Sequence, residues 1–305
     1  MTNGELEFLL AKMKKFSVQS CQNLAFSQLT TLGVGGTIKL TIYPDTPRKF
    51  KRSVSLLEKL RVKYYIVGKG SNILASDDDF DGVVISTVKL SAIKIRGASV
   101  KAYAGVSTAK LALELKRKGL SGGEFFACLP ASVGGAVVCN AGCYGQNVEE
   151  TVKKVAVLYK GKIKILSAKK CCFSKRNSIF KRTGKYAVLY AVFKFVKSTP
   201  QAVYNTITDM KCKKAQSQPL NYRSAGCVLY HDRVAVSKLL DESGLKGLTI
   251  GGAQVSLKHA GFVVNTGDAT SCDVYSLIRR MRETLTANYG ISAKTEVCLV
   301  NFSKE

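Results

Sequence analysis

The chain has 305 residues, and its 47 Lys and Arg against 21 Asp and Glu give a formal net charge of +26. With 46% hydrophobic residues it is too apolar for a disordered protein, and its length predicts two or three domains. It contains no long apolar run, which argues against a membrane-spanning helix.

The positive charge has two interpretations. A nucleic-acid partner is the first. Against it, the basic residues are spread through every segment, and no helix-turn-helix, zinc-finger or RNA-binding signature accompanies them. A solvated, lysine-rich surface is the favoured interpretation, with a positive field that speeds the approach of anionic small molecules. We therefore expect neither a nucleic-acid partner nor a membrane partner, and the sequence leaves the oligomeric state open.

Ten cysteines follow a start, MTNGELEFLLAKMKK, that has the pattern of a helix and not of a signal peptide. Cysteines without a secretory signal indicate a reducing compartment, so we expect a cytoplasmic protein with free thiols. No metal site is expected, because C-x-x-C is missing and the histidines are only His231 and His259.

The first part of the chain predicts helices over residues 5–15 and 47–62 and strands over residues 32–43, 64–67 and 83–85. The motif GKGSN follows the second strand directly. It is not the dinucleotide fingerprint, which needs G-x-G-x-x-G at the start of a helix. Its serine and asparagine are either donors to a diphosphate or ordinary turn residues, and the motif alone does not separate the two.

A helix is predicted over residues 104–119, and after it comes the stretch FACLPASVGGAVVCNAGCYG, residues 126–145. Its glycines Gly134, Gly135 and Gly142 permit positive φ and close backbone approach, and a turn with exposed amides forms a seat for phosphate. The alternative is a tight buried loop packed against a strand. Because GKGSN is a second loop of this kind, we expect one long ligand with several phosphates.

The remaining elements are a hairpin, three strands, three helices and a closing strand, which carries Glu296 among apolar residues. Cys227 follows a glycine at a predicted strand start, where inert burial is usual for a lone cysteine. His231 lies four residues further on, too far along a strand for a Cys–His pair. The predicted ranges are 152–166 for the hairpin, 187–196, 250–255 and 260–265 for the strands, and 234–244 and 271–288 for two of the helices. The third helix is predicted from residue 201 to the turn at Pro219.

Seven motifs in a fixed order resemble those of the UDP-N-acetylenolpyruvoylglucosamine reductases of peptidoglycan synthesis, over nearly the whole chain. The length resembles the compact second type of that family. The motifs are Thr31–Gly36, GKGSN at 68–72, CLPASVGGAVVCNAGCYG at 128–145, RNS at 176–178, SAGC at 224–227, IGGAQVSLKHAGFVVN at 250–265 and EV at 296–297.

The resemblance implies an α+β fold: an FAD-binding fold of the vanillyl-alcohol-oxidase (PCMH) type with two subdomains, plus a smaller α+β substrate-binding domain. We expect the first FAD-binding subdomain at residues 1–87 and the second at 88–198. The substrate-binding domain is expected at 199–294, and the closing strand at 295–305 is expected to return to the first subdomain.

The resemblance further implies an NADPH-dependent flavoenzyme that reduces UDP-N-acetylglucosamine enolpyruvate to UDP-N-acetylmuramate through FAD. Arg176 and Glu296 would stabilise the enolic intermediate, and Cys227 would donate the proton in place of the family's usual serine. A thiol is the stronger acid of the two. The alternatives are a flavoprotein oxidase of the same fold with another substrate and a basic nucleic-acid-binding protein without catalysis.

The sequence departs from the family's motifs at two places, and the remaining implied site residues bind the cofactor or the substrate. Lys175 departs from the family's usual tyrosine, and Leu229–Asp232 replaces its F-K-N-P, so substrate contacts are expected to differ. Expected cofactor-binding residues are Gly68, Lys69, Gly70, Ser71, Asn72, Pro130, Ser132, Gly134, Gly135, Asn140 and Ala141. Expected substrate-binding residues are Lys213, Arg223, His231 and His259.

Overall fold

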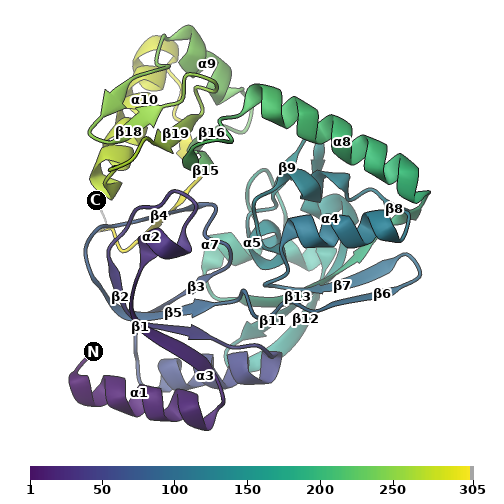
Figure 1. Ribbon diagram of the computed structural model, residues 1–305, viewed down its shortest axis with the longest axis vertical. Coiled ribbons are helices and arrows are strands. Elements are labelled where there is room, and N and C mark those ends of the chain that lie inside the picture. The colour runs from purple at the N-terminus through teal and green to yellow at the C-terminus, as the bar shows by residue number, and fades with distance from the viewer. Residues whose placement is uncertain (303–305) are drawn as a thin grey trace. The chain divides into compact units, whose positions relative to one another are not determined.

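A computed structural model of the chain describes residues 1–302 (Figure 1). Its residue contacts divide the chain into two compact units. Unit 1 consists of Met1–Gln22, Leu40–Lys69 and Asp81–Lys213, and unit 2 consists of Asn23–Lys39, Gly70–Phe80 and the chain from Lys214 onward. The three-domain division expected from the sequence stays a prediction.

The helices predicted at residues 5–15, 47–62 and 104–119 are confirmed as α1, α3 and α4. In α3 the Thr46 side chain accepts a hydrogen bond from Lys49 N–H and a proline opens the helix, a favourable helix start. The helices of unit 1, including 3₁₀-helices η1 and η2, are α1 (Asn3–Lys15), α3 (Pro47–Lys59), α4 (Thr108–Arg117), η1 (Glu124–Cys128), α5 (Val133–Val138), α6 (Val148–Thr151), η2 (Ala168–Cys171), α7 (Ile179–Thr183) and α8 (Pro200–Ser217), whose last residues belong to unit 2.

Two main sheets lie in or extend from unit 1. One has the strand order β1-β2-β5-β3, and the other is antiparallel with the order β12-β11-β13-β7-β6. Two short strand pairs, β9 with β10 and β8 with β14, are separate from these sheets. The strands of both sheets and both pairs are β1 (Gln19–Ala25), β2 (Thr37–Tyr43), β3 (Tyr64–Val67), β5 (Phe80–Ser86), β6 (Ile93–Arg96), β7 (Ser99–Tyr103), β8 (Leu120–Ser121), β9 (Gly142–Cys143), β10 (Gln146–Asn147), β11 (Val152–Tyr159), β12 (Lys162–Ser167), β13 (Ala187–Lys194) and β14 (Val196–Lys197).

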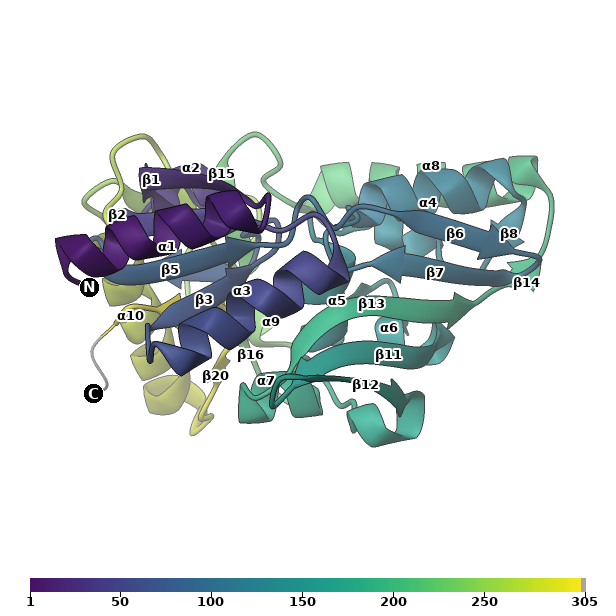
Figure 2. The same cartoon turned by 90° about the horizontal axis from the view of Figure 1, so that it is seen from below.

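Each face of the five-stranded sheet has its own core. Val100 and Ala102 of β7 pack with Leu111 and Leu115 of α4 on one face. Part of the opposite face, including Leu158, belongs to the core that α1 and α3 form with the other sheet. Figure 2 shows α4 behind the five-stranded sheet and α3 in front of only one end of it. The predicted hairpin at residues 152–166 is confirmed as β11 and β12.

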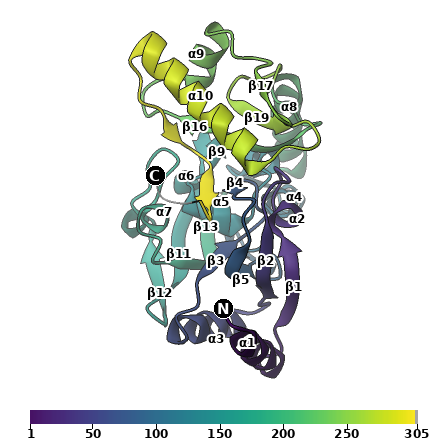
Figure 3. The ribbon, with the colours of Figure 1, turned by 90° about the vertical axis from the view of Figure 1, so that its left-hand side faces the viewer.

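Unit 2 is a four-stranded sheet of order β15-β19-β18-β17 with a long helix packed on it. Val274, Leu277, Ile278 and Met281 of α10 are fully buried in its core. Figure 3 shows α10 as the long yellow-green helix of this unit. The elements of unit 2 are α2 (Phe26–Leu29), β4 (Ile73–Ala75), β15 (Arg223–Cys227), β16 (Leu229–Tyr230), α9 (Val236–Glu242), β17 (Thr249–Ile250), β18 (Ala253–Val255), β19 (Phe262–Asn265), α10 (Ser271–Tyr289), β20 (Lys294–Thr295) and β21 (Cys298–Val300).

The structure corrects three strand predictions. The strand expected from residue 32 begins only at Thr37, because Gly33 and Gly35 have φ of 73° and 113°, which interrupts an extended strand. Cys227 ends β15 instead of starting a strand. The closing strand is divided at Glu296 into β20, which pairs with β16, and β21, which runs parallel to β4. Residues 303–305 of that predicted strand lie outside the described residues.

Within residues 1–302, none of the helices combines the length and the apolar character needed to cross a bilayer.

Candidate active site

The glycine-rich stretch expected to seat phosphate forms the short helix α5 and its flanking turns. Ser132 caps the helix, and its Oγ accepts a hydrogen bond from Gly135 N–H at 3.3 Å. Gly134 N–H donates to Ala104 O at 2.8 Å. Gly134, Gly135 and Gly142 all lack positive φ. The positive φ that these glycines permit is therefore not adopted, and the amides of Gly134 and Gly135 already have partners.

Close packing requires a glycine at residue 134, whereas Gly135 borders open space. A Cβ on Gly134 would lie 2.9 Å from Ala104 Cβ, which leaves no room for a side chain. Gly135 is exposed, and a Cβ there would meet only Ser132 Oγ, at 3.5 Å. Bare backbone at Gly135 thus borders free space on the outer side of α5, which fits a cofactor that approaches the main chain closely.

The start of the GKGSN loop, Gly68 and Lys69, lies in unit 1 together with the α5 stretch. Gly68 follows β3, and a Cβ on it would lie only 2.1 Å from Ser132 Oγ. Lys69 next to it is exposed. Pro130 is exposed before α5, and Ala141 follows that helix with its N–H donating to Ala136 O. This proximity agrees with the expectation of one ligand shared by both loops.

Asn140 connects the end of the α5 stretch to the turn that carries Arg176. The Asn140 side chain is buried, donates to Ser174 O at 3.1 Å and accepts from Glu149 N–H at 3.1 Å. Ser174 and Asn177 exchange backbone hydrogen bonds at 3.0 Å, which places Arg176 in a tight turn with φ of 55°. Asn140 therefore orients the arginine turn with its side chain.

Ser178 fastens the same turn from its other side. Its Oγ donates to Val138 O at 2.6 Å and accepts from Lys181 N–H at the start of α7. The Lys181 ammonium in turn donates to Arg176 O at 3.4 Å. The Asn-Ala-Gly and Arg-Asn-Ser motifs, which begin 36 residues apart at Asn140 and Arg176, are thus one structure in unit 1.

In unit 2, the segments that carry Cys227 and Glu296 contact each other through the main chain. Glu296 N–H donates to the carbonyl of Val228, the residue after Cys227, at 2.8 Å. Both side chains are partly exposed. Glu296 belongs to the short segment between β20 and β21, so the two strand pairs on either side of it hold it in place. The main-chain contact therefore brings together the two segments that carry the expected proton donor and the expected carboxyl group.

Asn72 of the GKGSN motif holds Glu296 from a second direction. Its Nδ2 donates to Glu296 O at 3.2 Å, and its carbonyl accepts from Cys298 N–H at 2.9 Å. Gly70 has φ of 65°, and its carbonyl accepts from Thr31 N–H. Ser71 is half-buried between them. The hydrogen bond to Glu296 O therefore competes with a diphosphate for the Asn72 side-chain amide. Donation to a diphosphate was one of the two roles that the motif left open.

The threonine-to-glycine motif lies against the Ser-Ala-Gly-Cys motif. Thr31 Oγ1 donates to Ser224 O at 2.7 Å. A Cβ on Gly33 would lie 2.9 Å from Arg223 Nη1, so the arginine side chain covers that glycine. Asn265 Nδ2 donates to Leu32 O at 3.1 Å. Arg223, one of the expected substrate residues, is therefore positioned by the first motif of the chain.

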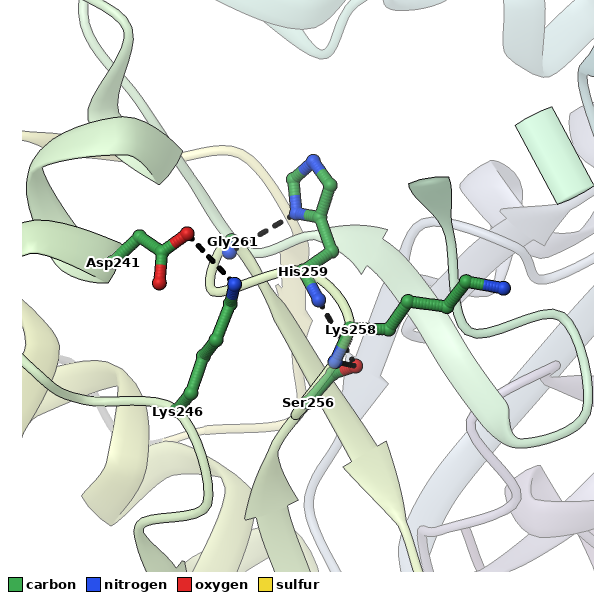
Figure 4. Close-up of polar contacts among 6 residues, drawn as sticks. All are labelled: Asp241, Lys246, Ser256, Lys258, His259 and Gly261. Atoms are coloured by element: carbon green, nitrogen blue, oxygen red, sulfur yellow. Dashed lines mark hydrogen bonds and ion pairs between the residues drawn. The ribbon is translucent and has the colours of Figure 1, made fainter. Parts of the chain in front are cut away.

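His259 lies at the turn between β18 and β19 (Figure 4). Its Nδ1 accepts from Gly261 N–H at 3.1 Å, which leaves the ring proton on Nε2. Burial lowers the pKa of the His259 imidazole, and the nearby Lys246 ammonium acts in the same direction. Lys246 is paired with Asp241 at 2.7 Å, and that carboxylate opposes the shift. His259 is therefore a neutral hydrogen-bonding group near pH 7.

The other two expected substrate residues have local partners. Lys213 on α8 pairs with Asp209 at 2.8 Å, and both side chains are well exposed. His231 Nδ1 accepts from Arg233 N–H at 3.3 Å. Neither contact brings these side chains to Cys227 or to His259, so their expected role stays a prediction.

A pocket of about 240 Å³ in unit 2 holds residues that the sequence did not single out. Lys258 and Tyr222 line it, and Lys258 Nζ donates to Ala215 O. Both residues are sequence neighbours of expected ones, His259 and Arg223. The Lys-His pair of the sixth motif is the sequence signal that points to Lys258. Other lining residues are Gln218, Asn221, Gln254 and Ser256.

Comparison with known proteins gives this arrangement a family. The profile described as "UDP-N-acetylenolpyruvoylglucosamine reductase, C-terminal domain" matches residues 218–300, and "FAD binding domain" matches residues 38–167. A reductase of that name from Clostridium novyi (strain NT) is 34% identical over 99% of this chain and 97% of its own. The chain belongs to the UDP-N-acetylenolpyruvoylglucosamine reductase family.

Two further relatives agree with this membership. A reductase from Thermotoga sp. (strain RQ2) is 37% identical over 88% of this chain and 89% of its own. The crystal structure of UDP-N-acetylenolpyruvylglucosamine reductase (MurB) from Thermus caldophilus covers 93% of this chain and 98% of its own, with 28% identity and a TM-score of 0.79. The predicted fold class, an FAD-binding fold of the PCMH type with an additional C-terminal domain, is thereby confirmed.

The two matched ranges contain different site residues. Gly68, Ser132 and Gly135 lie in the FAD-binding match, and Cys227 and Glu296 lie in the C-terminal match. The residues named here fit FAD, since the uncovered main chain at Gly135 is the kind of surface that a bulky dinucleotide can approach. The arginine turn lies outside both matched ranges, so its role depends on its contacts alone.

Proposed function

We propose that the protein reduces UDP-N-acetylglucosamine enolpyruvate to UDP-N-acetylmuramate in peptidoglycan precursor synthesis, with bound FAD as cofactor and NADPH as reductant. Identity of 34–37% to reductases of this name, over 88–99% of the chain, is the observation that carries it. The backbone contact between the Cys227 and Glu296 motifs adds geometric support.

The reaction adds a hydride to the methylene carbon of the enolpyruvyl group and a proton to the neighbouring carbon. Bound FAD supplies the two-electron hydride chemistry. Hydride addition leaves negative charge on an enolate conjugated to the substrate carboxylate. A fixed cation or hydrogen-bond donor beside that charge stabilises the transition state more than the ground state. Arg176 is proposed as that cation, since its turn is fastened by Asn140 and Ser178.

Cys227 is proposed as the general acid that gives its Sγ proton to the enolate carbon. A thiol with an ordinary pKa of about 8.5 is protonated at neutral pH and still far more acidic than an alcohol. Glu296, whose main chain is held by Val228 O and Asn72 Nδ2, is proposed to stabilise the enolic intermediate together with Arg176. The thiolate that remains is reprotonated from solvent.

Substrate contacts in unit 2 are proposed for Arg223 and His259, together with the pocket residues Tyr222 and Lys258. A cation and a ring in one hollow suit a nucleotide diphosphate. Lys213 and His231 are also proposed as substrate contacts, on the family resemblance alone. NADPH rather than NADH is proposed as reductant from the family resemblance.

One assay tests the function. The purified yellow protein should oxidise NADPH only when UDP-N-acetylglucosamine enolpyruvate is added, with little turnover of O₂. A protein without bound flavin contradicts the proposal. Rapid O₂ consumption with no response to the enolpyruvyl substrate supports the rival, a flavoprotein oxidase of the same fold.

A further inference from the structure

The net charge of the chain is confined to one of its two units. Unit 1 contains 35 Lys and Arg against 10 Asp and Glu, a net charge of +25, whereas unit 2 contains 12 against 11, a net charge of +1. The basic residues are therefore not evenly spread, as the linear sequence suggested.

One face of the five-stranded sheet in unit 1 carries five of these basic residues. Strand registers place Lys94 and Arg96 of β6, Lys101 of β7, Lys154 of β11 and Lys194 of β13 on the same side of the sheet. These five residues are called the basic face. The five strands contain no Asp or Glu, and among residues 1–302 none of the five cations has an ion-pair partner.

The basic face is open and electrostatically unfavourable on its own. In Figure 2 no helix lies in front of β7 and β13 at the end of the sheet away from α3. Lys94 is directly opposite Lys101 in the β6–β7 register. Like charges directly opposite one another destabilise a strand pair. A flat anionic partner would relieve that repulsion, whereas a second copy of this chain would bring the same positive charge.

The aromatic residues of this face are not available for stacking with bases. Tyr103 and Tyr190 lie 5.5 Å apart between ring centroids, and Lys101 Nζ lies 3.6 Å from the Tyr190 centroid. Both rings are half-buried. Single-stranded nucleic acids gain much of their affinity from stacking on exposed rings. The face therefore lacks the feature that would favour a nucleic acid.

Two exposed isoleucines continue the same face at its edge. Ile163 and Ile165 of β12 pair with Leu158 and Ala156 of β11, on the side that carries Lys154. They are 46% and 60% exposed. Apolar side chains next to a row of lysines suit a surface with anionic headgroups above hydrocarbon. Nucleic acid offers no comparable site for them.

We propose that the basic face is a peripheral docking surface for an anionic lipid bilayer, with the Lys and Arg side chains on the headgroups and Ile163 and Ile165 entering the interface. This departs from the expectation of no membrane partner, which considered only spanning segments. The proposal is independent of the reaction assigned to the protein.

Vesicle sedimentation of the FAD-loaded protein tests the proposal. Vesicles of phosphatidylcholine with about one third phosphatidylglycerol should bind it, and pure phosphatidylcholine should not. Replacing Lys94, Lys154 and Lys194 by Gln should lower the partition coefficient about 100-fold, at roughly a factor of 5 per basic residue. The matched control replaces Lys116, Arg117 and Lys118 by Gln, at the end of α4 on the opposite side of the sheet, and should bind like the wild type.

Two further measurements separate this surface from a general charge effect. Ile163→Ser with Ile165→Ser should weaken vesicle binding and leave the anisotropy of a single-stranded oligonucleotide unchanged. Equal losses for the two lysine sets overturn the proposal, as does oligonucleotide binding tighter than vesicle binding. Flavin content and circular dichroism verify folding, and the single change Arg96→Gln gives a milder loss if the triple variant does not fold.

Discussion

Cys227 stands where a hydroxyl is usual in this family. Its proposed role can be tested separately because it affects only one of the two half-reactions of the flavin. Cys227→Ala should leave reduction of the flavin by NADPH near the wild-type rate. It should slow flavin reoxidation by the enolpyruvyl substrate about 10²–10⁴-fold, the usual contribution of a general acid. Stopped-flow flavin absorbance measures the two half-reactions separately.

Cys227→Ser is the conservative control for this experiment and should recover much of the lost rate, because a hydroxyl also carries a transferable proton. If Cys227→Ala is reoxidised as fast as the wild type, Cys227 is not the donor and Glu296 is the next candidate.

His259 links stability to pH. Its folded-state pKa is lowered mainly by burial, so the unfolded chain binds more protons as pH falls below about 6.5, the ordinary histidine value. The contribution to stability is complete above that pH and is lost as pH falls towards the lowered folded-state value. We expect the free energy of unfolding to decrease between pH 7.5 and 5.5, and denaturant titrations measure it.

His259→Asn is the matched variant, because its side-chain oxygen can still accept from Gly261 N–H. The variant should show a smaller decrease in unfolding free energy over the same pH range. An unchanged pH dependence would mean that His259 titrates alike in the folded and unfolded chains.

The two adjacent glycines of α5 should respond differently to a side chain. Gly135→Val should remain folded but lose FAD, because its Cβ points into open space where the cofactor is proposed to approach. Gly134→Val should lower the melting temperature, because a Cβ there lies 2.9 Å from Ala104 Cβ. Flavin absorbance per protein and thermal unfolding distinguish the two, and a folded Gly135→Val protein with full flavin content would assign this helix a purely structural role.

The link between α5 and the arginine turn gives a prediction about Asn140. Asn140→Ala removes the hydrogen bonds to Ser174 O and Glu149 N–H, which should cost about 1–3 kcal/mol of unfolding free energy. Loosening the Arg176 turn should also slow flavin reoxidation while flavin content stays close to wild type.

Asn140→Gly separates the side chain from the backbone, since glycine accepts φ of 44° without strain. It should be more stable than Asn140→Ala and equally slow in reoxidation. Loss of FAD from both variants would instead make Asn140 a direct cofactor contact.

The charge of the whole molecule predicts the salt dependence of its kinetics. A positive field speeds the association of anionic ligands and is screened by salt, with a Debye length of about 8 Å at physiological ionic strength. We expect kcat/KM for NADPH to fall as ionic strength rises, with kcat nearly constant. Steady-state rates in NaCl and in choline chloride measure this, and an equal fall in kcat would point to an effect on the catalytic steps.

Local sequence patterns predicted several elements of the fold. Helix spacing, capping residues and glycine stops predicted α1, α3 and α4, because these signals act over a few neighbouring residues. The order of seven short motifs was enough to indicate the family, and the relatives confirm it.

Contacts between distant segments could not be predicted in this way, because they depend on how whole elements pack and not on periodicity. Glu296 meets Val228 because β20 pairs with β16 and β21 with β4. The buried Asn140 amide finds its partner 34 residues away, in the turn before Arg176. Strand register alone gathers Lys94, Lys101 and Lys154 on one side of a sheet, so charge that is dispersed along the chain becomes a single face in space.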